Sequence, residues 1–398
     1  MTALEIRASV SLASIFALRL LGLFLILPVF AVHAQSIPGG NDPKWVGLAL
    51  GIYGLTQGVL QIPYGAASDR WGRKPVIAAG LVVFAIGSFV AAAADDIFWT
   101  IVGRSIQGAG AISAAVTASI ADATRDEHRT KAMALVGASV GLTFAGSLVV
   151  APALYPVIGV KGLFTLTGIL VIAAIGVLVW VVPATPQKIA SARGRRTGRV
   201  WLDPQLLRLN VGIFVLHTVL MAIFVVLPSL LVTTGALPLA EHWKVYLPVV
   251  LLSFALMMKP LMIAERRALV RPLFIGSIVL VLTAQVGLVL YGGTLLWIGV
   301  WLLVFFTGFN ILEACLPSLV SRIAPASAKG FALGIYNTAQ ALGLFAGGAL
   351  GGVVAQRWGA EAVFGSAAML TAAWCLVAVG MREVPIKGVG EPTSIESH

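Results

Sequence analysis

The chain has 398 residues, of which 59% are hydrophobic and only 11% are charged, and its mean hydropathy is +0.97. Soluble domains carry about a quarter charged residues, so this composition excludes a soluble globular protein. The two cysteines, Cys315 and Cys375, lie in apolar stretches and indicate neither a disulfide framework nor a metal site.

Stretches of about 20 apolar residues predict membrane-spanning helices. The first stretch is too long for a cleavable signal peptide, and no small-residue cleavage pattern leads from it into a soluble domain. We therefore predict an all-α membrane protein with twelve transmembrane helices. The predicted helices are residues 8–33, 44–66, 75–94, 98–121, 131–154, 162–182, 209–232, 243–263, 271–291, 294–319, 330–356 and 361–381.

One long basic connection interrupts the otherwise short loops, and it divides the chain into three parts. We predict an N-terminal six-helix bundle (1–182), a cytoplasmic linker (183–208) that is attracted to anionic headgroups, and a C-terminal six-helix bundle with a short tail (209–398). The halves look like a parallel repeat, because SDRWGRKP (68–75) and AERRALVRP (264–272) follow equivalent helices. Parallel six-helix halves around a midplane site are a known transporter design.

The Lys and Arg residues gather on one side of the predicted helices. That side holds 21 of the 27, the opposite side holds four, and two lie within spans. Cytoplasmic loops carry such an excess, so we predict that both termini are cytoplasmic and that the protein is a multi-pass component of a bacterial inner membrane. The same excess accounts for the net charge of +11 without a nucleic-acid partner.

Several segments resemble a known family. GAASDRWGRKP (65–75) and RSIQGAGAI (104–112) are similar to two motifs of the major facilitator superfamily, and ALRLLGLFLILPVF (17–30) and FNILEACLPSLVSR (309–322) are most similar to its YajR-like group of proton-driven efflux carriers. The resemblance implies two pseudo-symmetric six-helix bundles and alternating access, and we expect no extra C-terminal soluble domain. The antiporter motif on helix 5 is imperfect, since Ala151-Pro152 stands where the family has Gly-Pro.

The resemblance also implies a conformational latch at the cytoplasmic ends of helices 2 to 4. Its members are Asp69, Arg70, Arg73 and Asp122, with Asp122 at the end of helix 4 as the expected partner of Arg73, and its role is to hold the two halves together in the outward-open state. The alternative is that the basic residues only anchor the loop to headgroups. We favour the latch because an anchor has no need of Asp69.

Ionisable residues within spans are costly and usually mark substrate or ion paths. By family analogy helices 1, 4, 7 and 10 line the central cavity, and each carries one deep ionisable residue: Arg19, Arg104, His217 and Glu313. Glu313 is the only carboxylate away from the ends of the predicted spans. Because burial disfavours a carboxylate anion, we predict that Glu313 binds the coupling proton, together with Arg19 as its counter-charge from the opposite half and with Arg104.

An alternative role of Glu313 stays open at this stage. Glu313 is also placed for a static ion pair with Lys259 or Arg322, which lie toward the cytoplasmic ends of their helices. The substrate cavity is predicted to be lined by His217, by Asn310 on the same helical face as Glu313, and by Tyr336 and Gln340, which share a face of helix 11.

The leading function is a secondary transporter that exports small amphipathic organic molecules in exchange for protons. It needs no cofactor, and we expect a monomer whose partners are the lipid bilayer and a small-molecule substrate. The alternative is a copper importer of the same superfamily, in which His217 and Met221 on helix 7 and Met258 and Met262 on helix 8 bind the metal. Zinc-hydrolase and nucleotide-binding loop patterns are absent from the sequence, so we do not expect an enzyme.

The predicted topology can be checked with single cysteines in intact cells. Cysteines at Lys44, Asp96 and Lys244 should react with a membrane-impermeant reagent added outside, because these positions lie in outer loops. A cysteine at Arg195 should react only after lysis. Labelling of position 195 in intact cells would contradict the topology.

Overall fold

The computed structural model describes residues 1–183, 202–267, 269–325 and 328–381. Within these ranges the chain is helical and contains no strand. Most of the predicted linker, including Arg195, and the predicted tail lie outside the described residues. The long helices are α1 (Ala3–Phe24), α3 (Pro43–Trp71), α4 (Arg73–Ala93), α7 (Asp126–Gly176), α9 (Pro204–Thr233), α10 (Trp243–Arg267), α11 (Val270–Tyr291), α12 (Leu295–Ile323) and α13 (Lys329–Val379). The short elements are α2 (Leu27–His33), η1 (Ala34–Ser36), α5 (Ile97–Ala109), α6 (Ser113–Ala123), η2 (Val177–Val181) and η3 (Leu239–Glu241).

Polar caps fix where several of these helices begin. Asp42 and Asp203 each accept a backbone N–H at the start of α3 and α9, and each is followed by a proline. Proline suits the first helical turn because its missing N–H has no partner there anyway. Thr2 and Glu5 form a reciprocal capping box at the start of α1, so even the first turn has its backbone donors satisfied.

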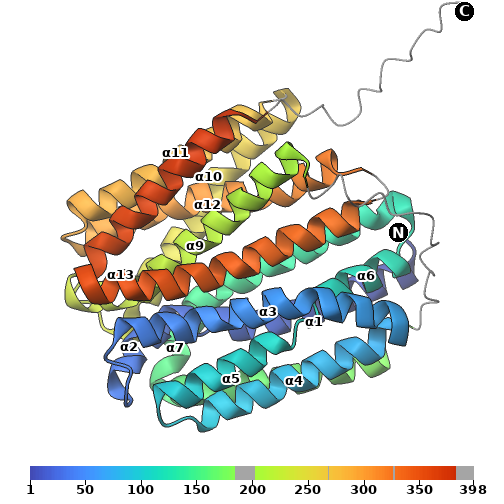
Figure 1. The fold of residues 1–398 in the computed structure, drawn as a ribbon, viewed down its shortest axis with the longest axis horizontal. Helices are drawn as coiled ribbons and strands as arrows, with labels where there is room; N and C mark the ends of the chain where they lie inside the picture. Colours follow the sequence, from blue (N-terminus) through green and yellow to red (C-terminus); the bar gives the residue numbers. More distant parts are fainter. Residues whose placement is uncertain (184–201, 268, 326–327, 382–398) are drawn as a thin grey trace, which may run out of the picture.

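The two longest helices each contain two passes. Both α7 and α13 have 51 residues and turn back at one glycine with positive φ, Gly159 (φ 62°) and Gly359 (φ 81°). Figure 1 shows α13 running across the bundle and then doubling back beside α11. The connections that the predicted helix ends leave, 155–161 and 357–360, are therefore too long. A glycine with positive φ lets the chain turn back without a longer loop. The two glycines stand 200 residues apart, which agrees with the predicted repeat offset.

Helices 1 and 4, predicted to be continuous over 8–33 and 98–121, are both interrupted. The first pass breaks between α1 and α2, where Pro28 cannot donate a backbone hydrogen bond. The fourth breaks between α5 and α6 at Gly110, which packs so closely against the carbonyl oxygen of Gly80 and against Cβ and the backbone nitrogen of Phe84 that a side chain has no room. Hydropathy alone does not indicate either break, because both segments stay apolar throughout.

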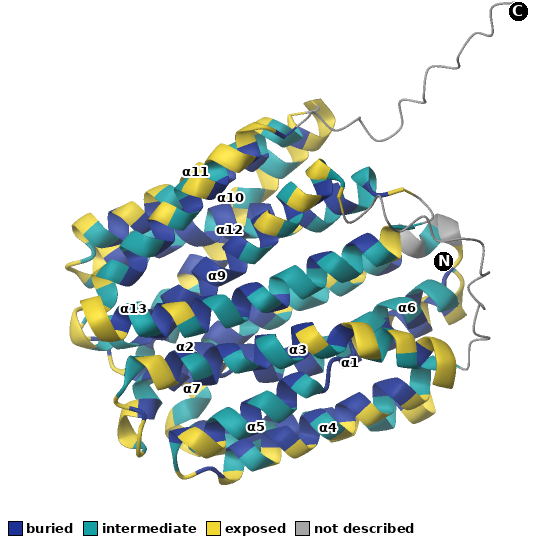
Figure 2. Cartoon of the chain, in the orientation of Figure 1, coloured by how far each residue is buried: buried dark blue, intermediate teal, exposed yellow. Residues whose placement is uncertain are grey.

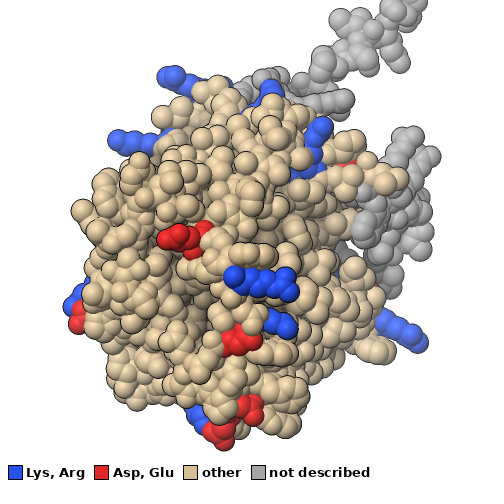
Figure 3. Space-filling view, turned by 60° about the vertical axis from the view of Figure 1, so that its left-hand side comes forward, with Lys and Arg blue, Asp and Glu red and all other residues tan. Residues whose placement is uncertain are grey.

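In the described part of the chain, nine helices are long and apolar enough to cross a membrane. When α7 and α13 are each divided at their glycine, and α5 and α6 are taken as one interrupted pass, the helices match the twelve predicted ranges. Exposed side chains lie along the periphery and at the helix ends (Figure 2). The face in Figure 3 is mostly uncharged, with isolated charged residues, as expected of a surface that contacts lipid.

The two halves meet on the side of the bundle opposite the linker, which we call the far side. There α3 of the first half packs on α13 of the second through glycines: Gly47 contacts Gly348 and Gly352, and Gly54 contacts Ala341. Hydrogen bonds from Gln35 to Ser229 (3.4 Å) and from Gln356 to Asp42 (3.0 Å) also cross between the halves on this side. Small residues of this kind let two helix backbones approach closely in a membrane.

On the linker side the glycines of the facing helices have open space. Among the described residues, no atom lies within 4 Å of a Cβ built on Gly137 or Gly141 of α7, or on Gly330 or Gly334 of α13. The described contacts between the halves are therefore concentrated on the far side. This arrangement is closed on the far side.

A larger residue at Gly348 should prevent closure of the far side. A side chain there would meet the backbone of Gly47 and Gly51, so Gly348→Leu should increase the distance between spin labels placed at Lys44 and Arg357, measured by electron–electron double resonance. Gly365→Leu, on the same helix with open space around it, is the matched control and should leave the distance distribution unchanged. Equal distributions in both variants would contradict this account of the closure.

Candidate functional site

The intramembrane carboxylate, Glu313 on α12, lies within a cluster of polar side chains from three helices of the second half. The side-chain amide of Gln340 on α13 donates to its Oε1 at 3.3 Å, and Nε2 of His217 on α9 lies 3.9 Å from its Oε2. The Glu313 side chain is 29% exposed, whereas that of His217 is 7% exposed. Glu313 is therefore reachable by water or substrate, while its polar neighbours are held by the packed helices.

The other two predicted cavity residues lie on the same helices. Asn310, one turn before Glu313, donates to Ser253 on α10 at 3.0 Å. Tyr336, one turn before Gln340, is buried, and its hydroxyl has no hydrogen-bond partner among the described residues. The four predicted cavity residues thus differ in their contacts. His217 and Gln340 contact Glu313 and each other, and Asn310 links α12 to α10. The hydroxyl of Tyr336 makes no hydrogen bond with the described residues.

We predicted that Arg19 is the counter-charge of Glu313, but the structure does not contain this ion pair. Arg19 is fully buried in the first half, where it donates to Ser113 on α6 (3.1 Å) and to Gln57 on α3 (3.2 Å). Its guanidinium also lies 5.6 Å from the ring centre of Tyr53. The alternative pair with Arg322 is also not formed, because Arg322 pairs with Glu265 at 3.7 Å. The sequence predicted the helix that carries Arg19, but the side chain of Arg19 does not contact α12 as we expected.

Arg104, predicted as a proton-coupling residue, holds three helices of the first half together. Its guanidinium donates to Oε1 of Gln107 at 2.9 Å and to the backbone carbonyl oxygens of Gly22, Ala49 and Leu50 at 3.3–3.5 Å. All of these acceptors are neutral, and the side chain is 1% exposed. This geometry favours a structural role, because the charge is withdrawn from the path and shared among backbone carbonyls of α1 and α3.

The predicted latch residues lie together at the linker-side ends of α3, α4 and α6. Arg73 donates to Asp122 at 2.9 Å, to Asp69 at 2.5 Å and to Ser68 at 2.7 Å, and Arg70 lies exposed beside them. The proposed partnership of Arg73 and Asp122 is therefore present. All of these contacts lie within the first half, so the action of the cluster as a latch between the halves stays a prediction.

The four residues of the copper alternative do not converge on one buried point. Met221 is fully buried in the core, and His217 uses its ring nitrogens for contacts to Ile213 and Gln340. Met258 and Met262 are 49% and 47% exposed and lie on the exposed face of α10. The helical spacing that motivated this alternative is real, but the two pairs differ in burial.

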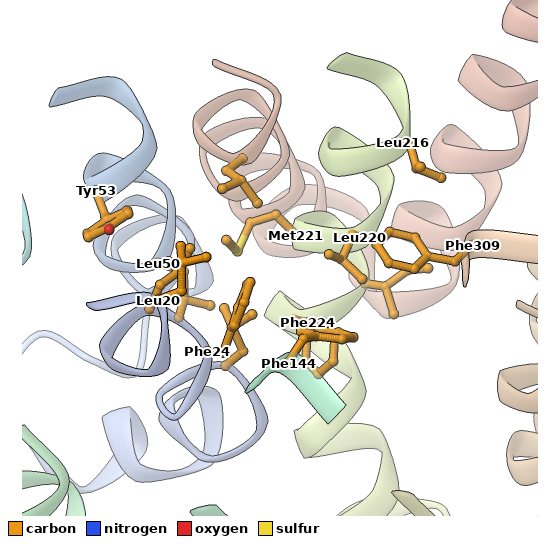
Figure 4. Close-up of a cluster of buried hydrophobic side chains, with 14 of the residues drawn as sticks. Leu20, Phe24, Leu50, Tyr53, Phe144, Leu216, Leu220, Met221, Phe224 and Phe309 are labelled. Atoms are coloured by element: carbon orange, nitrogen blue, oxygen red, sulfur yellow. The ribbon is translucent and has the colours of Figure 1, made fainter. Parts of the chain in front are cut away.

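A cluster of five phenylalanines fills the space between the halves. Phe144 of α7 lies 5.0 Å, between ring centres, from Phe24 of α1, and 5.9–6.3 Å from three rings of the second half: Phe224 of α9 and Phe306 and Phe309 of α12. Figure 4 shows four of these side chains, Phe24, Phe144, Phe224 and Phe309, with Leu20, Leu50 and Met221 near them. On both α9 and α12 the cluster lies nearer the far side than His217 and Glu313, so it separates the polar cluster from that side.

Several partners of the buried charges were not predicted as site residues. Gln107 was recognisable, since it follows Arg104 by three residues and therefore shares its helical face. Ser113 gave no signal, because its position beside Arg19 depends on the break between α5 and α6.

Comparisons with known proteins agree on one family. The sequence profile of the Major Facilitator Superfamily matches residues 12–348. The inner membrane transport protein YajR of Escherichia coli K12 is 43% identical over 393 residues, covering 97% of this chain and 85% of that protein. The multidrug resistance protein MdtH of Yersinia enterocolitica is 28% identical over 347 residues, covering 84% of this chain and 82% of that protein.

A solved structure shows the same fold. The crystal structure of a bacterial homologue of the human lysosomal transporter Spinster, in an inward-facing and occupied conformation, matches with a TM-score of 0.75 over 95% of each chain, at 12% identity. The predicted fold class is confirmed by this match and by the family profile.

Loss of the Arg104 side chain should destabilise the first half. Interhelical hydrogen bonds in membranes contribute about 0.6 kcal/mol each on average, so the three bonds of Arg104 to α1 and α3 predict that Arg104→Gln lowers the free energy of unfolding by about 2 kcal/mol. Thermal unfolding of the purified protein measures this as a lower midpoint. Lys259→Gln, which changes an exposed cation on α10, is the control, and an unchanged midpoint in Arg104→Gln would contradict the structural role.

Proposed function

Because the chain belongs to the major facilitator superfamily, whose members are transporters and not enzymes, we propose that it exports small amphipathic organic molecules in exchange for protons. The coupling proton binds at Glu313. The energy source is the proton gradient, with no cofactor. The protein acts as a monomer in the inner membrane of a bacterium, with both termini and the linker side in the cytoplasm.

The observation that carries this proposal is the environment of Glu313. Its carboxyl group lies among α9, α12 and α13, with a neutral amide and an imidazole as its polar neighbours. In the described part of the chain, no Lys or Arg lies within ion-pair distance of it. A carboxyl group without a fixed cation is free to exist in either protonation state, and a proton carrier requires both.

The phenylalanine cluster supports alternating access. It lies between Glu313 and the far side, where the glycine contacts of α3 and α13 also bring the halves together. With the far side closed, a proton or substrate reaches Glu313 only from the linker side. Rocking of the halves would break the contacts of Phe144 with α9 and α12 and expose the same carboxyl group to the far side.

The relatives support the direction and the substrate class. YajR is described as an inner membrane transport protein and MdtH as a multidrug resistance protein. Efflux of drug-like molecules matches a site that combines one carboxyl group with aromatic rings, since such a site recognises amphipathic molecules by burial rather than by many directed hydrogen bonds. A thermal-shift screen against drugs, metabolites and metal ions would identify ligands, because a bound ligand stabilises the folded state.

Substitution of Glu313 should separate binding from coupling. In proteoliposomes with an imposed pH gradient, Glu313→Gln should lose at least about 90% of uphill ethidium transport and of the accompanying pH change, because the amide binds no proton. Ethidium exchange without a gradient should persist. Glu265→Gln, which changes a carboxylate at the linker-side end of α10 that is 61% exposed, is the matched control. Uphill accumulation by Glu313→Gln would show that the coupling proton uses another route.

A further inference from the structure

The contacts of His217 determine which of its nitrogens exchanges a proton. Nδ1 lies 3.2 Å from the carbonyl oxygen of Ile213, which can only accept, so Nδ1 carries a hydrogen. Nε2 then holds the lone pair of the neutral ring. It lies 2.8 Å from the amide nitrogen of Gln340 and 3.9 Å from Oε2 of Glu313. A proton taken up by His217 therefore arrives on the side that faces Gln340 and Glu313.

One amide group of Gln340 contacts both titratable side chains. Its Nε2 donates to Oε1 of Glu313 at 3.3 Å and faces Nε2 of His217 at 2.8 Å. This orientation requires an acceptor on each side, which fits a neutral imidazole and a carboxylate oxygen. When Nε2 of His217 gains a hydrogen, two donors face each other, so the amide has to turn and present its carbonyl oxygen. The turned amide accepts, and it then fits a protonated Glu313 that donates.

We propose that Gln340 is a positioning residue that joins His217 and Glu313 into one proton-binding unit. Loading the unit adds one proton to each group from water: an O–H bond forms at Glu313 and an N–H bond forms at Nε2 of His217, while an O–H bond of a hydronium ion breaks in each case. A carboxylate and a neutral imidazole thereby become a neutral acid and an imidazolium, the two states that the two orientations of the Gln340 amide fit. The inference rests on the proposed coupling role of Glu313 and adds a second proton acceptor to it.

Few other groups compete for these protons. Among the described residues, Tyr336 on α13 is the other titratable side chain that lies within range of the charge of Glu313, and a phenol keeps its hydrogen at neutral pH. Asn310 of α12 donates to Ser253 of α10 instead. The rings that pack nearby, such as Phe309 against His217 at 5.9 Å, do not titrate.

The unit can be tested with protons alone, without a transported substrate. The full chain is reconstituted in phosphatidylethanolamine and phosphatidylglycerol liposomes and titrated with acid. Infrared difference spectra follow the neutral carboxyl band that Glu313→Gln removes, and nitrogen NMR follows the imidazole signals that His217→Gln removes. Both probes should change at the same two midpoint pH values, because strongly interacting groups titrate as a pair. Separate single midpoints, or a silent His217, would overturn the proposal.

The role of Gln340 needs its own variant. Gln340→Leu should move the midpoints of both probes by about one pH unit, a tenfold change in proton affinity, since both groups lose a shared partner. Gln285→Leu, a buried glutamine of α11 in the same half, is the matched control and should move neither. If Gln340→Leu does not fold, Gln340→Asn, which is one methylene shorter, should give the same double shift. A shift of only one probe, or of none, would show that Gln340 does not join the pair.

This test and the transport experiment fail independently. Shared midpoints in a protein that does not couple ethidium transport to protons would refute the proposed function but leave the unit in place. Independent midpoints in a protein that does couple them would leave Glu313 alone as the proton site.

Discussion

The structure depends on one constraint: inside a bilayer there is no water to solvate a buried polar group, so each must find partners within the protein. The two halves of this chain meet the constraint in different ways. In the first half, Arg19 and Arg104 are surrounded by neutral acceptors from α1, α3, α5 and α6. In the second half, the carboxyl group of Glu313 is left with neighbours whose own hydrogen bonds can rearrange.

This difference assigns different mechanical roles to the halves. A guanidinium keeps its charge at every relevant pH, so the bonds of Arg104 persist while the transporter works and the first half moves as one body. A carboxyl group and an imidazole change charge, and their hydrogen bonds change with them. If the coupling proton binds at Glu313 as proposed, the second half contains the part that responds to protons, and the first half supplies the surface against which it closes.

The sequence predicted the helices and their grouping well, because hydropathy depends only on local composition. It also predicted which helices carry the deep charges, and the contact of Arg73 with Asp122 that the structure contains. It failed for the partner of Glu313. Helical spacing indicates which residues of one helix share a face. It does not indicate which neighbouring helix that face contacts. The opposite charge of Arg19 made it the obvious partner, whereas packing buries Arg19 against Ser113 and Gln57.

In the proposed mechanism, the protonation of Glu313 has a direct route to the contacts between the halves. Phe309 lies one turn before Glu313 on α12, its ring packs against His217 at 5.9 Å, and it contacts Phe144 of the opposite half at 6.0 Å. A charge that appears on His217 changes what the ring of Phe309 packs against, since an imidazolium and a neutral imidazole interact differently with an aromatic face. The same side chain thus belongs both to the surroundings of the proton unit and to the cluster that separates this unit from the far side. Protonation can then affect the contact between the halves without a long pathway, because Phe309 of α12 contacts both His217 and Phe144.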